Sequence, residues 1–200
     1  MRRHSLALLA LLAASACVPL PPAAVSSSLQ ATPELQTVNP SNIAVVPVED
    51  ATPGASLHAL LETVRDEIYA QLVLKRYAPL TSKVVDAVVR EKSAGAAGAS
   101  LARPEVLAQV AGTMNEDAVL CVRVTQWNDS RVMSASRVRF AADVIMVSAR
   151  TKATLWGGAI EGEVKAGGTA AAPRYREERL ADIARQMARA IISQLPSHVL

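Results

Sequence analysis

Apolar and polar residues follow two different periods along the chain. In the first half, apolar side chains recur at every third or fourth position, the spacing that gives a helix one buried face. The clearest run comprises Leu57, Leu60, Leu61, Val64, Ile68, Leu72 and Val73. In the second half the period falls to two, as in a strand with one buried face. That run comprises Val138, Phe140, Ala142, Val144 and Met146, with Arg137, Arg139 and Asp143 on the opposite face.

Taken in order, the pattern predicts β-α-β-α-α-β-β-β-α. The predicted strands are residues 42–48, 77–82 (a brief strand or an extended connection), 117–127, 131–150 and 151–164. The predicted helices are residues 57–73, 84–92, 103–111 and 175–195. The strand 117–127 is almost continuously apolar, which is typical of a strand covered on both faces. We therefore predict an α+β fold with a single mixed sheet packed by helices, paired parallel early and antiparallel late.

Residues 1–16 predict a signal peptide. A basic start at Arg2 and Arg3 precedes a short apolar run, Leu6 to Leu12, and then a cleavage region of small residues. The apolar run is well short of the roughly 20 residues that a membrane-spanning helix needs.

Cys17 directly follows these small residues. The stretch "AASAC" resembles a bacterial lipobox, in which the cysteine thiol receives a diacylglyceryl group and becomes the acylated first residue. The alternative is cleavage after Ala14-Ser15-Ala16 by the ordinary A-x-A rule, which gives a secreted protein without a lipid. We favour lipidation of Cys17.

Residues 17–40 are expected to be the lipidated cysteine and a flexible tether. Pro, Ser, Ala and Thr dominate after Cys17, and no hydrophobic period persists. The tether is therefore predicted to contribute nothing to the folding of the α+β domain, residues 41–200.

Charge and composition narrow the classes of partner that the protein is expected to bind. Without Arg2 and Arg3 of the leader, 19 basic residues face 18 acidic ones, and aromatic residues make up only 3% of the chain. Neither feature favours a nucleic-acid partner. Four arginines predict a basic strip on the sheet, which is either a solvated, partly ion-paired face or a surface for an anionic partner such as lipid headgroups or a cell-wall polymer. They are Arg123, Arg131, Arg137 and Arg139.

Residues suited to catalysis are scarce. His58 is the one histidine well inside the domain, and Cys121 lies in the apolar run "AVLCVRV", where it is expected to be a small buried side chain. The adjacent carboxylates Glu49-Asp50 and Glu116-Asp117 either cap helices or bind a cation weakly. We predict no catalytic, cofactor-binding or metal-binding residue.

Two stretches resemble a known superfamily. "NIAVVPVED" is similar to the opening strand of the TolB amino-terminal domain and of the curli-secretion lipoprotein CsgG, and "VIMVSARTKATLWGGAIEGEV" to a later hairpin of that superfamily. Within it the likeness is to bacterial lipoproteins of the neisserial surface-antigen type. The resemblance gives Arg150, Thr151, Leu155 and Trp156 a structural role in shaping the hairpin. Ser148 stands where the pattern often has Asp, and Lys152 where it has the turn Gly.

The resemblance implies a non-enzymatic envelope lipoprotein, an accessory or assembly factor that works through protein contacts. The expected location is the outer membrane, facing the periplasm, because Val18 is not the aspartate that retains many lipoproteins at the inner membrane. Partners would be envelope proteins, a CsgG-like lipoprotein among the candidates, and self-association is a further option. The alternative is a secreted hydrolase or cell-wall-modifying enzyme with an unrecognised site.

Overall fold

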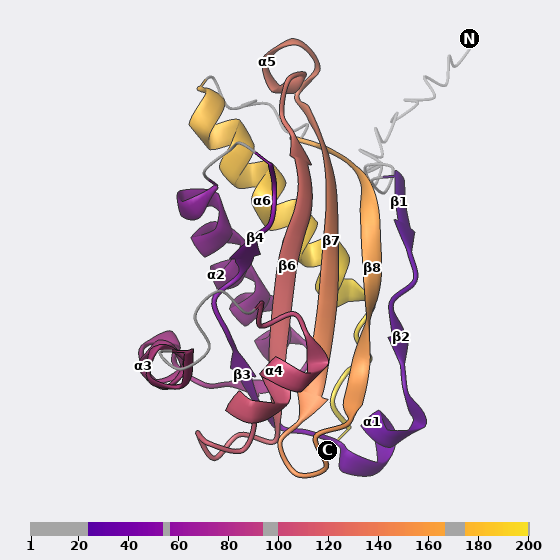
Figure 1. Cartoon of the computed structure of the whole chain (residues 1–200). Coiled ribbons are helices and arrows are strands. Elements are labelled where there is room, and N and C mark those ends of the chain that lie inside the picture. Colours follow the sequence, from indigo (N-terminus) through magenta and orange to yellow (C-terminus); the bar gives the residue numbers. More distant parts are fainter. Residues whose placement is uncertain (1–23, 54–56, 94–99, 167–174, 200) are drawn as a thin grey trace, which may run out of the picture.

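The computed structural model describes residues 24–53, 57–93, 100–166 and 175–199, which form one mixed sheet with helices on both faces (Figure 1). The strands are β1 (Ala24–Ser27), β2 (Gln30–Ala31), β3 (Asn42–Val45), β4 (Glu49–Asp50), β5 (Ala78–Pro79), β6 (Ala118–Asn128), β7 (Arg137–Ser148) and β8 (Thr154–Lys165). The helices are α1 (Pro33–Val38), α2 (His58–Leu74), α3 (Ser82–Ser93), α4 (Pro104–Val110), α5 (Val132–Ala135) and α6 (Arg176–Ser193). The predicted α+β fold is confirmed.

From β3 onward, the sheet changes from parallel to antiparallel pairing along the chain. Its order is β1-β8-β7-β6-β3-β5, with β2 also on β8 and β4 also on β6. β3 runs parallel to β5 and β6, and β4 runs parallel to β6. β6, β7 and β8 form an antiparallel meander. Parallel pairing early and antiparallel pairing late is the arrangement that the sequence predicts.

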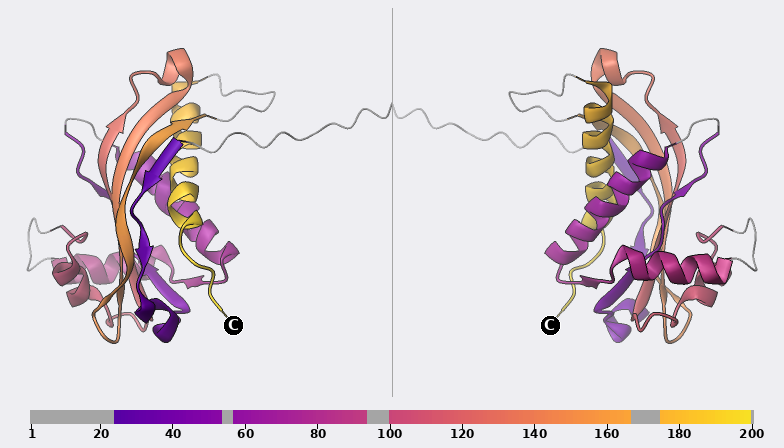
Figure 2. Two further views of the ribbon diagram at one scale, coloured as in Figure 1. Left: turned by 90° about the vertical axis from the view of Figure 1, so that its right-hand side faces the viewer. Right: turned by 90° about the vertical axis from the view of Figure 1, so that its left-hand side faces the viewer.

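Helices cover the two faces of the sheet unequally. α2 and α6 lie along one face, and α3 and α4 cover the other face only near its α1 end (Figure 2). The strand β6 contributes to both resulting cores, because Leu120 packs on the α2 and α6 side and Cys121 on the α3 and α4 side. Both side chains are completely buried, so the prediction of a strand covered on both faces is confirmed.

Residues 24–40 are not a tether. β1 and β2 pair antiparallel with β8, and α1 follows them. Leu35 of α1 is only 4% exposed and joins the main core. The segment lacks a hydrophobic period because an edge strand attaches through its backbone, for example from Thr32 N to Leu155 O at 2.9 Å. The predicted boundary at residue 41 is therefore too late.

Gly158 allows this segment to approach β8 closely. Its φ is +142°, and a Cβ built there would lie 2.5 Å from the backbone oxygen of Ser28. The neighbouring Ala159 exchanges backbone and side-chain hydrogen bonds with Ser28. A glycine is thus required at the point where the N-terminal segment crosses from β1 to β2.

The strand predicted for residues 131–150 begins later than expected. α5 occupies its start, and Ser136 then takes a left-handed backbone conformation with φ of 54° before β7. Arg179 of α6 holds this turn by donating to the carbonyl oxygens of Val132 and Met133 and to Ser136 Oγ. A contact from the far end of the sequence therefore overrides the local strand pattern.

Arg65 ties the two helical layers together at the edge of the sheet. This α2 residue is 2% exposed, and its Nη2 donates to Val45 O at 2.8 Å and to Asp86 Oδ1 of α3 at 2.6 Å. A buried guanidinium needs such partners, because an unpaired buried charge is strongly destabilising.

Candidate interaction surface

The part of one sheet face that lies toward α5 has no helix over it among the described residues. α3 and α4 cover the α1 end of this face, where Cys121, Ile145 and Val147 are buried. Toward α5 the outward side chains of β1, β6, β7 and β8 become polar or small. We call this region the open face; it comprises Ser26, Arg123, Thr125, Gln126, Arg139, Ala141, Asp143, Ala159, Glu161 and Glu163.

The open face is hollowed at two adjoining places. One hollow of about 460 Å³ is lined by Ser26, Gln126, Arg139, Glu161 and Glu163, among others. The second, of about 290 Å³, lies beside it and shares Ser26 and Glu161.

Small side chains create the second hollow. Ala141 of β7, Ala159 of β8 and the serines of β1 contribute to its lining, so a neighbouring molecule can approach the backbone of the sheet here. Longer side chains at its border, such as Asp143 and Glu161, supply hydrogen-bonding groups.

Charges of both signs alternate across the open face. The register places Arg123 opposite Asp143, and Arg139 opposite Glu163. Arg137 donates to Glu163 Oε1 at 2.8 Å. The predicted basic strip is therefore interrupted by carboxylates from neighbouring strands, and Arg131 is not part of it, because it precedes α5 at the end of the sheet.

The two carboxylate pairs hold loops in place. Glu116 accepts from the backbone N–H groups of Gly112 and Met114, and Asp117 from those of Ser41 and Asn42. These bonds organise the loop before β6 and the start of β3. The expectation that this pair caps a helix is wrong, because the N–H groups that it accepts from belong to loops and to the start of β3.

Glu49 and Asp50 are used in the same way. Glu49 accepts from Ser100 Oγ and Leu101 N, and Asp50 from Thr52 N and Leu57 N, which leads into α2. Burial by itself would raise the pKa of Asp50, but the hydrogen bonds from Thr52 and Leu57 lower it below its ordinary value.

The remaining candidate groups lie apart from one another. His58 is exposed at the first position of α2. Cys121 is fully buried in the α3 and α4 core, and burial raises the pKa of its thiol well above the ordinary value. Such a thiol is a poor nucleophile. In the described ranges, no three His, Cys, Asp or Glu side chains are grouped to hold a metal ion.

The hairpin residues divide between the turn and the core. Arg150 and Thr151 lie in the turn between β7 and β8, where their backbone N–H groups donate to Ser148 Oγ at 3.3 and 3.1 Å. Leu155 and Trp156 are completely buried on β8 in the main core. Cys17 lies outside the described residues.

Ser148 and Lys152 explain how the turn works without the residues of the superfamily pattern. Ser148 is buried and its hydroxyl accepts the turn hydrogen bonds that an Asp carboxylate would accept. Lys152 takes a left-handed conformation, with φ of 63°, at the position where the pattern has Gly. Its Nζ donates to Ala111 O, which anchors the turn to the end of α4.

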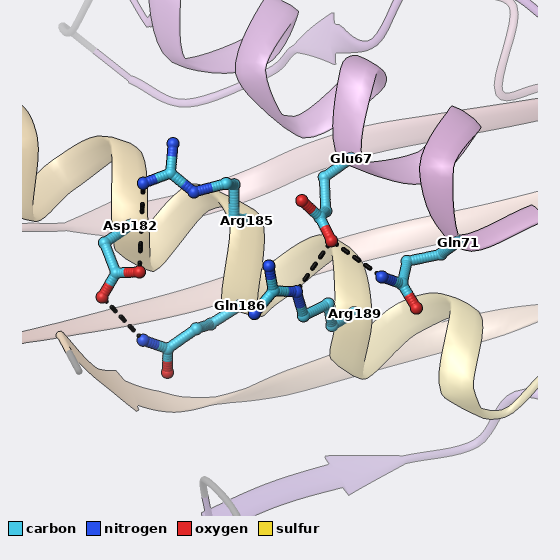
Figure 3. Close-up of polar contacts among 6 residues, drawn as sticks. All are labelled: Glu67, Gln71, Asp182, Arg185, Gln186 and Arg189. Carbon is cyan, nitrogen blue, oxygen red and sulfur yellow. Dashed lines mark hydrogen bonds and ion pairs between the residues drawn. The ribbon is translucent and has the colours of Figure 1, made fainter. Parts of the chain in front are cut away.

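An ion pair joins α2 to α6 on the face opposite the open face. Figure 3 shows Arg189 of α6 pointing at Glu67 of α2, with Nε and Oε1 2.7 Å apart. Gln71 donates to the same oxygen at 2.8 Å. Burial favours a higher pKa for Glu67, but the bonds from Arg189 and Gln71 lower it below its ordinary value. Glu67 is thus engaged within the fold.

A third hollow, of about 380 Å³, lies between α1 and the C-terminal segment, and no pattern in the sequence predicts it. Tyr77 forms part of its wall, and its hydroxyl donates to Pro196 O at 2.8 Å. Burial raises the pKa of Tyr77 to about 12. Asn39 Nδ2 donates to Val199 O, so the C-terminal segment is fastened over α1.

Comparisons with known proteins place the fold. No family model and no curated protein matches the chain. Among solved structures, CT253 from Chlamydia trachomatis matches with a TM-score of 0.51 and 10% identity over 79% of this chain and 96% of that protein. This likeness is one of fold alone.

Two further structures match at lower TM-scores. The lipoprotein GNA1162 from Neisseria meningitidis has a TM-score of 0.48 and 20% identity over 78% of this chain and 98% of that one. PelC from Paraburkholderia phytofirmans, solved as a dodecamer, has a TM-score of 0.46 and 12% identity over 86% of this chain and 98% of that one. Among the described residues, no helix is both long and apolar enough to cross a membrane.

Proposed function

We propose that this chain is a lipid-anchored protein of the bacterial cell envelope, of the TolB amino-terminal and CsgG-like type, that acts as an accessory or assembly factor. It binds another envelope protein through the open face and does not catalyse a reaction. The anchor is Cys17, and the location is the outer membrane, facing the periplasm. The lipobox-like ending of the leader supports the anchor.

The observation that carries the binding role is the second hollow, on the part of the sheet face that no helix covers among the described residues. Thr125, Ala141 and Ala159 form its floor, and charges of both signs surround it. Such a border fixes the position and the orientation of a partner surface whose charges are complementary to it. Because the charges nearly balance, the fitting partner is a protein of mixed charge rather than a polyanion.

The available functional groups also support binding over catalysis. Cys121 is buried, His58 is exposed on a helix, and the paired carboxylates accept hydrogen bonds that hold loops. General acid–base chemistry needs such groups to converge on one bound molecule.

In-cell photo-crosslinking tests the proposal. A photoreactive amino acid at Thr125 should capture one stoichiometric envelope protein, and the same group at Ala70, on the exposed side of α2, should not. In a chain carrying the group at Thr125, Ala141→Arg should abolish capture by filling the hollow, whereas Ala70→Arg should leave it intact.

Thermal melts of the same variants separate a blocked surface from a damaged fold. Ala141→Arg should melt within a few degrees of the wild type, because the side chain points outward into the hollow. Capture from Ala70 equal to that from Thr125, or release of cell-wall fragments by the purified protein, would refute the proposal.

A further inference from the structure

We infer that the end of the domain that carries α5 rests on the anionic headgroups of the membrane that holds the lipid. This inference depends on the proposed lipidation of Cys17. It assigns an orientation and a second membrane contact to the domain, formed by protein side chains in addition to the acyl chains.

A short stretch of chain joins the proposed lipid to the fold. Only residues 18–23 separate Cys17 from the start of β1 at Ala24. Seven Cα–Cα steps of at most 3.6 Å span about 25 Å. The domain is therefore held close to the bilayer surface.

The chain enters the fold near its α5 end. Ala24 pairs with Glu163 of β8, which in turn pairs with Arg139 of β7, so β1 starts near the α5 end. The opposite end of β7, Ser148, is nine residues further along, or about 30 Å. If that end faced the bilayer, Ala24 would lie beyond the reach of the linker.

The α5 end exposes apolar, aromatic and basic side chains. Met133 and Tyr175 are 54% and 65% exposed there. Arg131 precedes Met133, and Lys165 ends the neighbouring β8. Tyrosine and basic side chains beside apolar ones suit the headgroup region of a bilayer.

The carboxylates at this end only partly offset its positive charge. Asp129 is bonded to Arg176, and Glu163 to Arg137. Within the described ranges, Arg131, Arg139 and Lys165 have no ion-pair partner, and they stand against Glu177 and Glu178 in the first turn of α6. These three cations are available to lipid phosphates.

Fluorescence quenching on the full lipidated chain tests the orientation. A fluorophore is attached to Met133→Cys or, as the matched control, to Val73→Cys near the C-terminal end of α2. The labelled protein is reconstituted in vesicles of phosphatidylethanolamine and phosphatidylglycerol that carry a headgroup quencher. Cys121 is buried and does not compete for the label. We expect loss of fluorescence at residue 133 and none at residue 73.

Charge reversal then tests the headgroup contact. Arg131→Glu with Lys165→Glu should remove the quenching at residue 133 while the protein still floats with the vesicles, and Arg90→Glu with Lys92→Glu on α3 should leave it unchanged. Unchanged quenching in the first pair would overturn the inference.

Flotation and mass analysis distinguish the two possible failures. Protein that floats with the vesicles but shows equal quenching at residues 133 and 73 overturns the orientation and leaves the anchor standing. Protein with an unmodified N-terminus that stays in solution overturns the anchor, and the orientation with it.

Discussion

The α-carbon of Gly158 in β8 packs against the backbone oxygen of Ser28, so closely that no side chain fits between them. A Cβ at residue 158 would lie 2.5 Å from that oxygen, and the φ of +142° is one that other residues rarely adopt. This single contact fixes the path of the N-terminal segment along the edge of the sheet.

Gly158→Ala is therefore expected to loosen residues 24–31 from β8. The backbone strain at such a φ costs about 1–3 kcal/mol, and the steric clash adds to it. Hydrogen exchange should accelerate at the β1 amides, and the melting temperature should fall. Ala159→Ser, at an exposed neighbouring position, is the control; equal protection in both variants would contradict the prediction.

Removal of the N-terminal segment is expected to destabilise the domain. A mature chain that starts at Pro40 loses β1, β2 and the buried Leu35, whereas one that starts at Ala24 keeps them. A buried leucine alone contributes about 1.5–3 kcal/mol, so the shorter chain should melt several degrees lower. Equal melting temperatures would restore the tether interpretation of residues 24–40.

The hydrophobic period predicts those elements whose stability comes from burying one face. α2, β7 and α6 were predicted for that reason, because Ile68, Phe140 and Met187 all lie in the main core. β1 and α5 were missed because neither depends on a period. β1 pairs through its backbone, and α5 is held by Arg179 from a distant part of the chain.

The open face, too, could be predicted only in part from the sequence. The alternation along β7 placed Arg139 and Asp143 on the outer side correctly, but the carboxylate facing Arg139 comes from β8. The sequence of one strand does not specify which charges its neighbours bring, because that depends on the register of the sheet. The hydrophobic pattern also did not predict how much of this sheet face α3 and α4 cover.

Trp156 is expected to be a structural anchor. It is fully buried opposite Met146 of β7, in the core that includes Met187 of α6. Truncation of a large aromatic side chain costs about 3–5 kcal/mol, so Trp156→Ala should lower the melting temperature sharply and reduce recovery from cells. Trp156→Phe should cost much less, because the indole Nε1 has no hydrogen-bond partner among the described residues. A stable Trp156→Ala protein would refute this role.

Ser148 is expected to be replaceable by aspartate but not by alanine. Its hydroxyl accepts from two backbone N–H groups of the turn, and their loss leaves part-buried donors unpaired. Ser148→Ala should destabilise the protein by about 1–3 kcal/mol, as measured by denaturant unfolding. Ser148→Asp should retain more stability than Ser148→Ala, and the reverse order would show that the hydroxyl is not the turn acceptor.

The ion pair between Glu67 and Arg189 is expected to make stability depend on pH. The pKa of Glu67 is lowered in the folded state, so the pair stabilises the protein above the unfolded pKa of about 4.3. That contribution is lost as the pH falls through the folded pKa. Glu67→Gln should cost up to about 1 kcal/mol at neutral pH.

Denaturant unfolding over a range of pH checks this sign. The difference between wild type and Glu67→Gln should shrink as the solution is acidified below pH of about 4. Glu62→Gln, at an exposed position of α2, controls for the change in net charge. A difference that grows on acidification would contradict the assignment.

The bond between Ser28 and Ala159 joins residues 131 positions apart, and this separation sets the order in which the fold can be completed. β1 is synthesised early but cannot pair until β8, which is synthesised much later, is present. Until then the outer edge of β8 has no neighbour, and an unpaired edge is the part of a sheet most prone to pair with other chains. The N-terminal segment thus completes the sheet by covering the edge of β8 that would otherwise stay unpaired.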